Sequence, residues 1–531
     1  MLFLLQSIAP LAERIPSSPP TLLTHILAPS HHTHPQQLRI VTQMALSRTL
    51  SSVRLAAGRR ALSSSGASAA SDNFDLFNPT AEHAEMRSML RSFAEEEVDP
   101  QALEFNRREE FNRPLFNKLG ELGVLGITVP AEYGGSEMDA TAACIAHEEL
   151  SAADPAFCLS FLAHSMLFVN NLVQNGNEEQ KQRFLPDACS GKIIGGMGMS
   201  EPGAGTDVLG LRSSVKKDGT DYILNGSKMW ITNGYSVNAS GEETTGDAFL
   251  VYARHDDAAK ASDLSLFLVE KGMPGFSVGQ KILDKCGMRA SNTAEIVFED
   301  VRIPKENLVG EENGAMICMM RNLEIERVVL GAMATGIARR CVEVMANYSE
   351  ERQAFGKPIA EFGQVCLRVG IMLCGVCVCG REGQNSFKLL WSASRRTLTT
   401  VPAPHPPTSL SLSLSLSLSL SLALQIQRHV AESYAEYMAG RSYLYNYSRS
   451  MKLENAGTRL DSDGIKLFTT TMSKNVADRA IQVLGGYGYC GEYQVEQLWR
   501  DSKLLEIGGG TLESHHKNMV KDLRKMGARL E

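Results

Sequence analysis

The chain has 531 residues, of which 43% are hydrophobic and 21% are charged, and its formal net charge is −7. This length allows roughly three domains, and the mild acidity gives no sign of a nucleic-acid partner. The 11 cysteines have no even spacing, which argues against a disulfide framework and favours a reducing compartment. Stable membrane insertion is not expected, because the longest apolar run near the start, "MLFLLQSIAPLA", is too short to span a bilayer.

Residues 1–71 are predicted to lie outside the folded protein. From Met44 to Ser71 the chain carries four arginines and many serines but no acid, which is typical of a mitochondrial or plastid transit peptide. A disordered basic tail is the alternative. Residues 1–43 precede a good start at Met44 and are interpreted as an over-long reading frame. No metal site is therefore predicted at the histidines in that stretch, which are His25, His31, His32 and His34.

Apolar spacing divides the rest of the chain into three regions. Residues 72–195 carry apolar side chains at three- and four-residue spacing, which is typical of helices. Residues 196–310 contain short strand patterns, in which Asp218-Gly219 and Asn225-Gly226 predict hairpins. Helical periodicity returns over residues 311–531. This order of helices, antiparallel strands and helices narrows the possible folds.

Residues 365–425 interrupt the last helical region. The segment ends in a Ser-Leu repeat at Ser409–Leu422, and without the segment the apolar periodicity on its two sides becomes continuous. Alternating pyrimidine codons encode Ser-Leu, so the repeat resembles a translated pyrimidine tract ahead of a splice acceptor. The segment is therefore interpreted as a retained intron. A low-complexity surface loop is the alternative. Three cysteines in the segment, Cys374, Cys377 and Cys379, are therefore not expected to bind zinc.

Two acids lie in an apolar stretch that is predicted to be helical over residues 314–340. Steps of three and four residues from Glu326 reach the apolar neighbours Met319, Leu323, Leu330 and Met333. Glu324 instead has Arg321 and Arg327 three residues away on either side, so it is predicted to be paired or solvated. A desolvated carboxyl group has a raised pKa and accepts a proton more readily near neutral pH. Glu326 is thus a candidate base, unless an arginine from another segment pairs with it.

Glycine-rich stretches suggest places where the backbone approaches a ligand. "SEPGAGTDV" at 200–208 has two glycines around Ala204, but it lacks the third glycine and the helix of a dinucleotide-binding fingerprint. "MWITNG" at 229–234 adds a flat indole next to the hydroxyl of Thr232, and "QVLGGYGY" at 482–489 adds another glycine pair. Each stretch alone is weak evidence, because a plain turn has the same composition.

Taken together, these stretches resemble the acyl-CoA dehydrogenase family. The motifs "MGMSEPGAGTDV", "KMWITNG", "DKCGMRASNTAEIVFEDVRIP", "ERQAFGKPIAEF" and "QVLGGYGY" occur in family order over nearly all of residues 75–531 apart from the interrupting segment. The resemblance implies an α+β multi-domain fold with a helical N-terminal domain, a middle β-barrel-like domain and a C-terminal four-helix bundle. It also implies an FAD cofactor and a homotetramer.

The family places its catalytic base at one of two sequence positions. Most members carry a glutamate in a "YEGT"-like motif near the C-terminus, and the matching residue here is Gly509. The isovaleryl-CoA and long-chain branches carry it in a "DLER"-like stretch, which is similar to "EIER" here and selects Glu326. The resemblance and the periodicity therefore indicate the same residue.

The resemblance also implies which residues bind the ligands. Residues expected to hold the isoalloxazine ring are Met197, Met199, Ser200, Gly205, Thr206, Trp230, Ile231 and Thr232, and those expected at the ADP portion are Arg352, Phe355, Gln482, Val483, Leu484, Gly485 and Gly486. Two residues expected to approach FAD from the C-terminal side are Thr511 and Glu513. Those expected at the substrate are Thr206, Glu324, Ile325, Arg327, Gly509 and Gly510.

The activity implied is FAD-dependent α,β-dehydrogenation of an acyl-CoA, with electrons passed to electron-transfer flavoprotein in the mitochondrial matrix. The acyl group is expected to be short and branched, as in isovaleryl-CoA. Leu505 stands where isovaleryl-type relatives often carry tyrosine, and His515 and His516 also depart from the family pattern, so a longer acyl chain is an alternative. An acyl-CoA oxidase and an isoform inactivated by residues 365–425 also stay open, as does an FAD-holding assembly factor, against which Glu326 argues.

Overall fold

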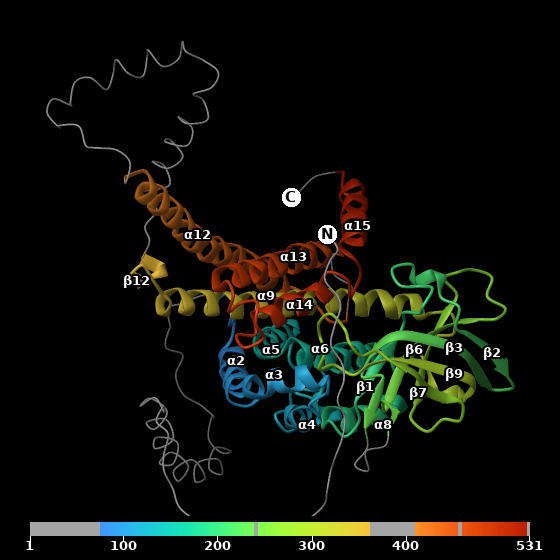
Figure 1. The fold of residues 1–531 in the computed structure, drawn as a ribbon. Helices are drawn as coiled ribbons and strands as arrows, with labels where there is room; N and C mark the ends of the chain where they lie inside the picture. The colour runs from blue at the N-terminus through green and yellow to red at the C-terminus, as the bar shows by residue number, and fades with distance from the viewer. Residues whose placement is uncertain (1–74, 238–242, 362–408, 455–458, 528–531) are drawn as a thin grey trace, which may run out of the picture. The chain divides into compact units, whose positions relative to one another are not determined.

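The computed structural model describes residues 75–237, 243–361, 409–454 and 459–527 (Figure 1). Side chains in the third of these ranges are described from residue 426 onward. The predicted transit and upstream segment at 1–71 and most of the predicted insert, residues 365–408, lie outside the described residues.

Helices form the N-terminal region, as the apolar spacing predicts. Their bounds are α2 Ala81–Phe93, η1 Ala94–Val98, α3 Asp99–Arg108, α4 Arg113–Glu121, α5 Ala140–Ala153, α6 Pro155–Leu162, η3 Ala163–Asn170, α7 Asn171–Asn175 and α8 Glu178–Cys189. Side-chain caps explain several of these boundaries. Asp154 accepts hydrogen bonds from the backbone of Ala156 and Phe157 at the start of α6, and Asn177 forms a capping box with Gln180 at the start of α8.

The most apolar part of this region is a core helix. Residues Pro155–Asn175 are long and apolar enough to cross a membrane, but 83% of their most apolar window is buried inside the protein. Every residue of the neighbouring helix α5 is buried as well. These helices therefore satisfy their hydrophobic surface by packing within the domain.

The middle region is an eight-stranded sheet. Its strands are β1 Gly195–Gly198, β2 Ser214–Asp218, β3 Asp221–Thr232, β6 Ala248–His255, β7 Leu264–Glu270, β8 Phe276–Lys281, β9 Thr293–Ile303 and β10 Leu308–Val309. They are ordered β10-β7-β6-β2-β3-β9-β8, with β1 paired to β6. Strands β1 and β2 pair with β6 in parallel, and the other pairs are antiparallel. A separate ribbon joins β4 Tyr235–Val237 to β5 Glu243–Thr245.

Both faces of the sheet are covered. Along β6, Phe249 and Val251 belong to one apolar cluster, whereas Leu250 and Tyr252 belong to a second cluster that includes the helical residue Met319. This alternation follows from the two-residue period of a strand. The second face therefore packs against helices, which brings the sheet next to the start of the C-terminal region.

One predicted hairpin is wrong. Asp218-Gly219 does mark the turn between β2 and β3, whose last pair is Asp218 with Asp221. Asn225-Gly226, however, lies inside the continuous strand β3, at a register shift against β9. Gly226 has φ +132°, and a Cβ atom there would lie 2.6 Å from Ser213 Oγ. The pair thus marks a β-bulge with close backbone approach, which glycine permits.

Helices return in the C-terminal region, as predicted. They are α9 Ala315–Glu351, α12 Ser409–Ser448, α13 Arg459–Leu484, α14 Val495–Leu505 and α15 Leu512–Lys525, with a short β11–β12 ribbon at Gln353–Ala354 and Lys357–Pro358. Helix α9 lies between α5 and the helices α12 and α13 (Figure 1). At its crossing with α5, a Cβ atom on Gly336 would lie 2.1 Å from Ser151 Oγ, so the small residue permits the contact.

Candidate active site

Helix α9 carries the candidate base on a buried face. Glu326 is 7% exposed, and its neighbours Met319, Leu330 and Met333 are buried as the periodicity predicts. Glu324 is 3% exposed, which excludes the solvated state considered for it. The surroundings of Glu326 therefore come from α9 itself and from the elements packed against α9, which include α5, α13 and β7.

Burial makes Glu326 a stronger proton acceptor. Desolvation raises the pKa of Glu326 to about 7, and the positive charges of Arg327 and Lys466 limit this rise. The Oε2 atom of Glu326 is buried and has no hydrogen-bond partner among the described residues. A carboxyl group with a pKa close to the working pH is well suited to general base catalysis.

This raised pKa predicts a pH-dependent stability. Between the ordinary value of 4.5 and about 7, the folded protein holds a proton on Glu326 that the unfolded chain has lost. Relative to a Glu326→Gln variant, the wild type is therefore favoured most below pH 4.5 and loses about 3 kcal/mol as the pH rises to 7. Urea unfolding of both proteins across this range measures the change. A constant difference would contradict the raised pKa.

A glycine turn packs against Glu326. Gly509 has φ +66°, and a Cβ atom at this residue would lie 2.5 Å from Leu330 Cδ1 and 3.5 Å from Glu326 Oε1. The second sequence position at which the family carries its base is thus beside the first position in space. The positive φ and the contact with Leu330 together favour glycine at this residue.

A polar network continues from the glycine turn into α13 and α15. Lys466 Nζ donates to the carbonyl of Gly510 at 2.6 Å, and His515 Nε2 lies 3.0 Å from the same oxygen. Asp463 Oδ1 lies 2.7 Å from His515 Nδ1 and 3.3 Å from Arg327 Nη1. Arg327, which was expected to line the acyl pocket, therefore forms an ion pair with α13. No sequence pattern predicted a role for Asp463 or Lys466.

The loop after β1 lies beside the same face of α9. Asn322, one turn before Glu326, is buried, and its Nδ2 atom lies 3.9 Å from Met197 Sδ. Gly205 and Thr206 are exposed, whereas Met199 is buried. Ser200 accepts a hydrogen bond from the backbone of Met229 at 2.8 Å, which fixes the loop to β3. The structure thus brings the predicted flavin loop and the candidate base together.

The indole of Trp230 is presented at an irregularity in β3. Trp230 has φ +60° and is 55% exposed, and it lies where the β3–β9 register shifts between Lys228 and Ile231. Ile231 is 3% exposed and packs in the sheet core, so only its backbone can contact a cofactor. Thr232 is half-buried.

The residues expected at the ADP portion of FAD lie elsewhere. A hollow of about 550 Å³ is lined by Arg352, Val483, Leu484, Gly485 and Gly486 together with Tyr487, whose ring centre is 5.8 Å from the Arg352 guanidinium carbon. Phe355 is 79% exposed, and neither it nor Gln482 is among the lining residues.

Helix α9 separates this hollow from the candidate base. Arg352 follows Glu326 by 26 residues along the helix and its C-terminal end, which corresponds to about 39 Å at the rise of an α-helix. The two groups of residues expected at FAD are therefore not brought together within one chain. Thr511 and Glu513 begin α15, next to Gly510 and hence on the Glu326 side.

Both groups of residues fit a dinucleotide cofactor. Cβ atoms at Gly203 and Gly205 would have no neighbour within 4 Å, and the same is true of Gly485 and Gly486. The first pair leaves the backbone open beside the exposed indole of Trp230, which offers a flat surface to a ring system. The second pair leaves it open beside a guanidinium group, which pairs well with phosphate.

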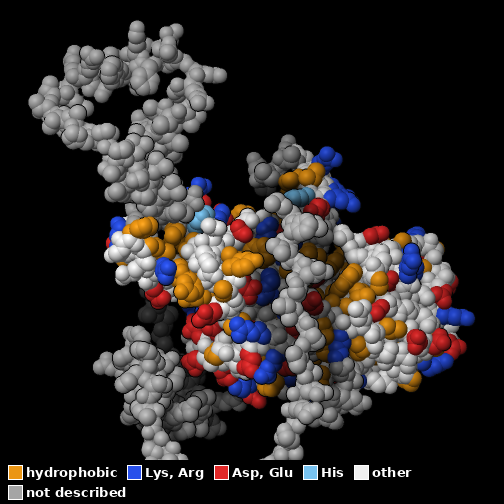
Figure 2. Space-filling model, viewed as in Figure 1, with side chains coloured by type: hydrophobic (Ala, Val, Ile, Leu, Met, Phe, Trp, Pro, Cys, Tyr) orange, Lys and Arg blue, Asp and Glu red, His pale blue; other side chains and the backbone are white. Residues whose placement is uncertain are grey.

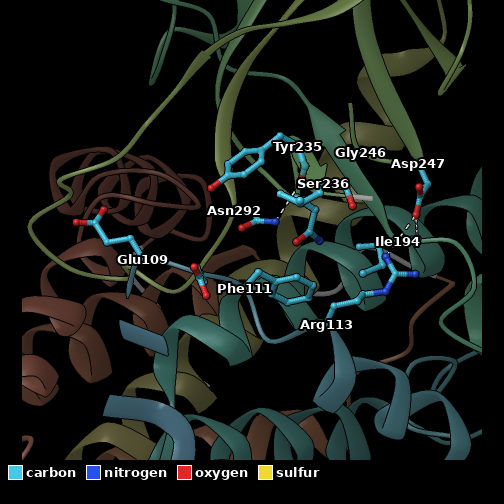
Figure 3. A pocket seen from close by; sticks show the side chains of 12 residues that line it. Glu109, Phe111, Arg113, Ile194, Tyr235, Ser236, Gly246, Asp247 and Asn292 are labelled. Carbon is cyan, nitrogen blue, oxygen red and sulfur yellow. Dashed lines mark hydrogen bonds and ion pairs between the residues drawn. The ribbon is translucent and has the colours of Figure 1, made fainter. Parts of the chain in front are cut away.

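A further hollow of about 340 Å³ lies between the sheet and the start of α4 (Figure 3). Arg113 and Asp247 face each other at 3.7 Å on one side of it, and Asn292 donates to the carbonyl of Tyr235 on the other. None of the residues predicted for the site lines this hollow.

Comparison with family models covers all three structural regions. Residues 80–192 match "Acyl-CoA dehydrogenase, N-terminal domain", residues 196–301 match the middle domain, and residues 313–380 and 423–523 match the C-terminal domain. The gap in the last match, residues 381–422, lies within the predicted insert.

Individual proteins show the same likeness. The chain is 35% identical to isovaleryl-CoA dehydrogenase, mitochondrial, from Pongo abelii, over 81% of this chain and 86% of that protein. It is 32% identical to 2-methylacyl-CoA dehydrogenase, mitochondrial, from Solanum tuberosum, over 83% of this chain and 90% of that protein. The structure of butyryl-CoA dehydrogenase from Megasphaera elsdenii superposes with a TM-score of 0.68 at 27% identity, covering 84% of this chain and 98% of that one. The chain therefore belongs to the acyl-CoA dehydrogenase family of FAD-dependent oxidoreductases, which act on the CH–CH bond of acyl-CoA thioesters.

Proposed function

We propose that this acyl-CoA dehydrogenase acts on a short, branched acyl-CoA such as isovaleryl-CoA. The observation that carries the chemistry is Glu326, a buried carboxyl group with a pKa of about 7 beside an open glycine turn. The acyl preference is supported by relatives named for isovaleryl-CoA and 2-methylacyl-CoA, each of which matches more than 80% of the chain.

In this proposal Glu326 accepts the α-proton of the acyl group. An α-C–H is far too weak an acid for a carboxylate in water, so the thioester oxygen must receive hydrogen bonds as enolate charge develops. Backbone N–H groups of the glycine turn around Gly509 and Gly510 are the proposed donors, and each well-aimed donor contributes about 3–4 kcal/mol. Burial of the site strengthens these interactions, because little water competes for them.

FAD supplies the acceptor for the β-hydride when it is bound. The proposed contacts of its ring system are the loop from Met197 to Thr206, with Trp230 and Thr232 on β3. The proposed contacts of its ADP portion are Arg352 and the glycines at 485 and 486.

The separation along α9 supports a homotetramer. If one chain supplies the residues around Trp230, a neighbouring copy can supply the hollow around Arg352, so that each FAD bridges two subunits. Apolar side chains gather over the helical bundle near α9 and α12 (Figure 2), and Tyr434 and Phe468 in this bundle are 55% and 43% exposed. Such a surface is typical of a subunit interface.

Reoxidation by electron-transfer flavoprotein in the mitochondrial matrix completes the proposal. It is supported by the family and by the transit-like sequence from Met44 to Ser71. The named mitochondrial relatives from Pongo abelii and Solanum tuberosum are consistent with this location.

A substrate panel tests the proposal. The full chain and a version lacking residues 365–425 are assayed with isovaleryl-, 2-methylbutyryl-, butyryl- and palmitoyl-CoA and an artificial electron acceptor. We expect the highest kcat/KM for a branched five-carbon acyl group in the shorter version. A preference for palmitoyl-CoA would overturn the acyl assignment. Rapid hydrogen peroxide formation in oxygen would instead indicate an oxidase, and no turnover by either version would refute the activity.

A further inference from the structure

Lys466 is a buried lysine whose ammonium group lies against the active-site turn. It is 0% exposed on α13, and its Nζ atom donates to the carbonyl of Gly510 at 2.6 Å. Gly510 has φ +104°, and the preceding Gly509 has φ +66°. This turn therefore has little intrinsic conformational preference, and an external hydrogen bond determines how it is held.

His515 does not replace Lys466 in this role. Its two ring nitrogens face Asp463 and the carbonyl of Gly510, and both of these partners accept hydrogen bonds. Burial lowers the pKa of His515, so the imidazole is neutral near pH 7 and donates only one hydrogen bond. Lys466 is thus the donor to Gly510 whichever tautomer His515 adopts.

The charge of Lys466 also lies close to Glu326. Lys466 Cε and Glu326 Oε1 are each 3.5 Å from the point where a Cβ atom of Gly509 would lie, so they are separated by at most twice that distance. No ion pair within 4.0 Å joins these two described side chains, because the ammonium is held by Gly510. The lysine is therefore near enough to act on the carboxylate without blocking it.

Other charged groups around the site are compensated by contacts of their own. Arg327 on α9 pairs with Asp463 on α13 at 3.3 Å. Glu506, after α14, pairs with Lys474 at 3.2 Å and with Lys503 at 2.6 Å. From the sheet, the buried phenol of Tyr252 faces Glu326, and burial raises its pKa well above neutrality, so it is uncharged.

We propose that Lys466 is a positioning residue that holds the Gly509–Gly510 turn beside Glu326 and supplies positive charge that favours the ionised form of this base. The inference rests on the proposed function of Glu326. Burial lowers the pKa of Lys466 to about 8, and the charge of Glu326 opposes this decrease, so the lysine is still protonated near pH 7. No sequence pattern identifies this lysine, and its contact with the glycine turn does.

Three substitutions separate the two roles. Lys466→Met removes both the charge and the hydrogen bond, Lys466→Gln keeps a donor for Gly510, and Lys466→Arg keeps both. The control is Lys521→Met, which makes the same charge change at an exposed side chain on α15. The primary measurement is the acidic limb of the pH profile of kcat/KM with the best acyl-CoA.

We expect the acidic limb to move up by one to two pH units in Lys466→Met and Lys466→Gln. Because Glu326 is about half ionised at pH 7 in the wild type, kcat/KM at this pH should fall roughly 5- to 50-fold. Lys466→Arg and Lys521→Met should keep the wild-type limb. The proposed hold on the turn predicts that KM rises more in Lys466→Met than in Lys466→Gln. If Lys466→Met does not fold, Lys466→Gln tests the charge. An unmoved limb in a folded, uncharged variant overturns the inference.

A second measurement does not require turnover. The pH dependence of the unfolding free-energy difference between wild type and Glu326→Gln reports the protonation of Glu326. Repeating it in the Lys466→Gln background should move the midpoint to higher pH. If the wild type oxidises no acyl-CoA, the proposed function fails while this readout still tests the coupling. An unchanged midpoint overturns the coupling itself.

Discussion

Replacing Glu326 with glutamine should lower kcat by about 10²- to 10⁴-fold, the range attributed to a well-placed general base. Glutamine has nearly the same shape, but its amide cannot take up the α-proton. The substitution removes a carboxyl group that is costly to bury, so the fold should be retained. The measurements are turnover of the best acyl-CoA with an artificial acceptor, and flavin absorbance of the purified protein.

The matched control is Glu343→Gln, an exposed residue further along the same helix. Both variants should bind flavin as the wild type does, and only Glu326→Gln should lose turnover. A Glu326→Gln protein with wild-type kcat would remove this residue from the mechanism. Loss of flavin together with activity would instead indicate a structural role for the carboxyl group.

The position of Glu326 was predictable because a single helix determines it. The repeat of apolar residues at three- and four-residue spacing assigns every side chain of α9 to a face, and the structure confirms Glu326 on the buried face. The periodicity predicted a helix across residues 314–340 but not where that helix ends, and α9 continues to Glu351. Helix ends depend on caps and on tertiary packing, which periodicity does not report.

Contacts between distant segments were not predictable in the same way. Lys466 and Asp463 are polar residues in a helix, a pattern that usually indicates a solvated face. Both are 0% exposed, because α9, α14 and α15 enclose that part of α13. The parallel pairing of β1 and β2 with β6 is also long-range, and strand patterns alone do not reveal it. Gly226 shows that a local turn signal can be overridden by a neighbouring strand.

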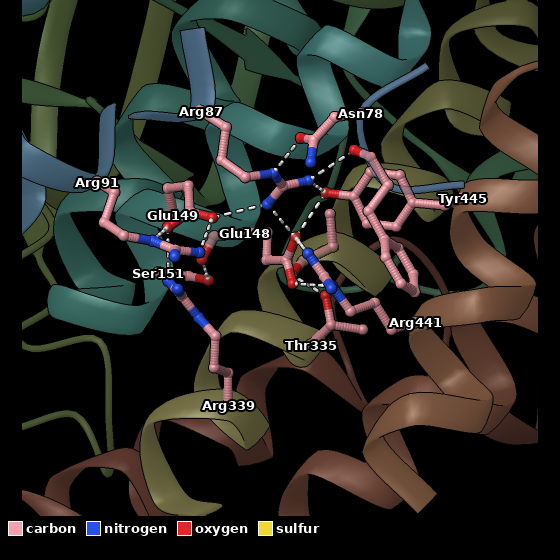
Figure 4. Close-up of polar contacts among 12 residues, drawn as sticks. Asn78, Arg87, Arg91, Glu148, Glu149, Ser151, Thr335, Arg339, Arg441 and Tyr445 are labelled. Carbon is pink, nitrogen blue, oxygen red and sulfur yellow. Dashed lines mark hydrogen bonds and ion pairs between the residues drawn. The ribbon is translucent and has the colours of Figure 1, made fainter. Parts of the chain in front are cut away.

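A second buried acid is expected to matter for stability rather than for chemistry. Glu148 on α5 is 0% exposed and accepts hydrogen bonds from Arg87 on α2 at 2.8 Å and from Arg441 on α12 at 2.7 Å (Figure 4). The hydroxyl of Tyr445 donates to it at 2.5 Å. Next to it, Glu149 pairs with Arg87, Arg91 and Arg339. The cluster thus joins α2, α5, α9 and α12.

Charge determines the state of Glu148. Burial alone would raise its pKa, but the nearby guanidinium groups of Arg441, Arg87 and Arg339 outweigh burial and lower the pKa to about 2. Its stabilising contribution is therefore fully present above the ordinary value of 4.5 and is lost as the pH falls through 2. Removing one partner from such a buried pair leaves charge without compensation.

Glu148→Gln should accordingly lower the free energy of unfolding by about 3–5 kcal/mol at pH 7. The arginines of α2 and α12 would then face an amide that offers one acceptor and no charge. The matched control is Glu104→Gln, which removes an acid whose side chain is 58% exposed and which pairs with Arg108 one turn away on α3. An exposed pair of this kind contributes about 0.5 kcal/mol or less. Urea unfolding at pH 7 measures both changes. Equal, small losses in the two variants would show that packing alone holds α12 against the N-terminal helices.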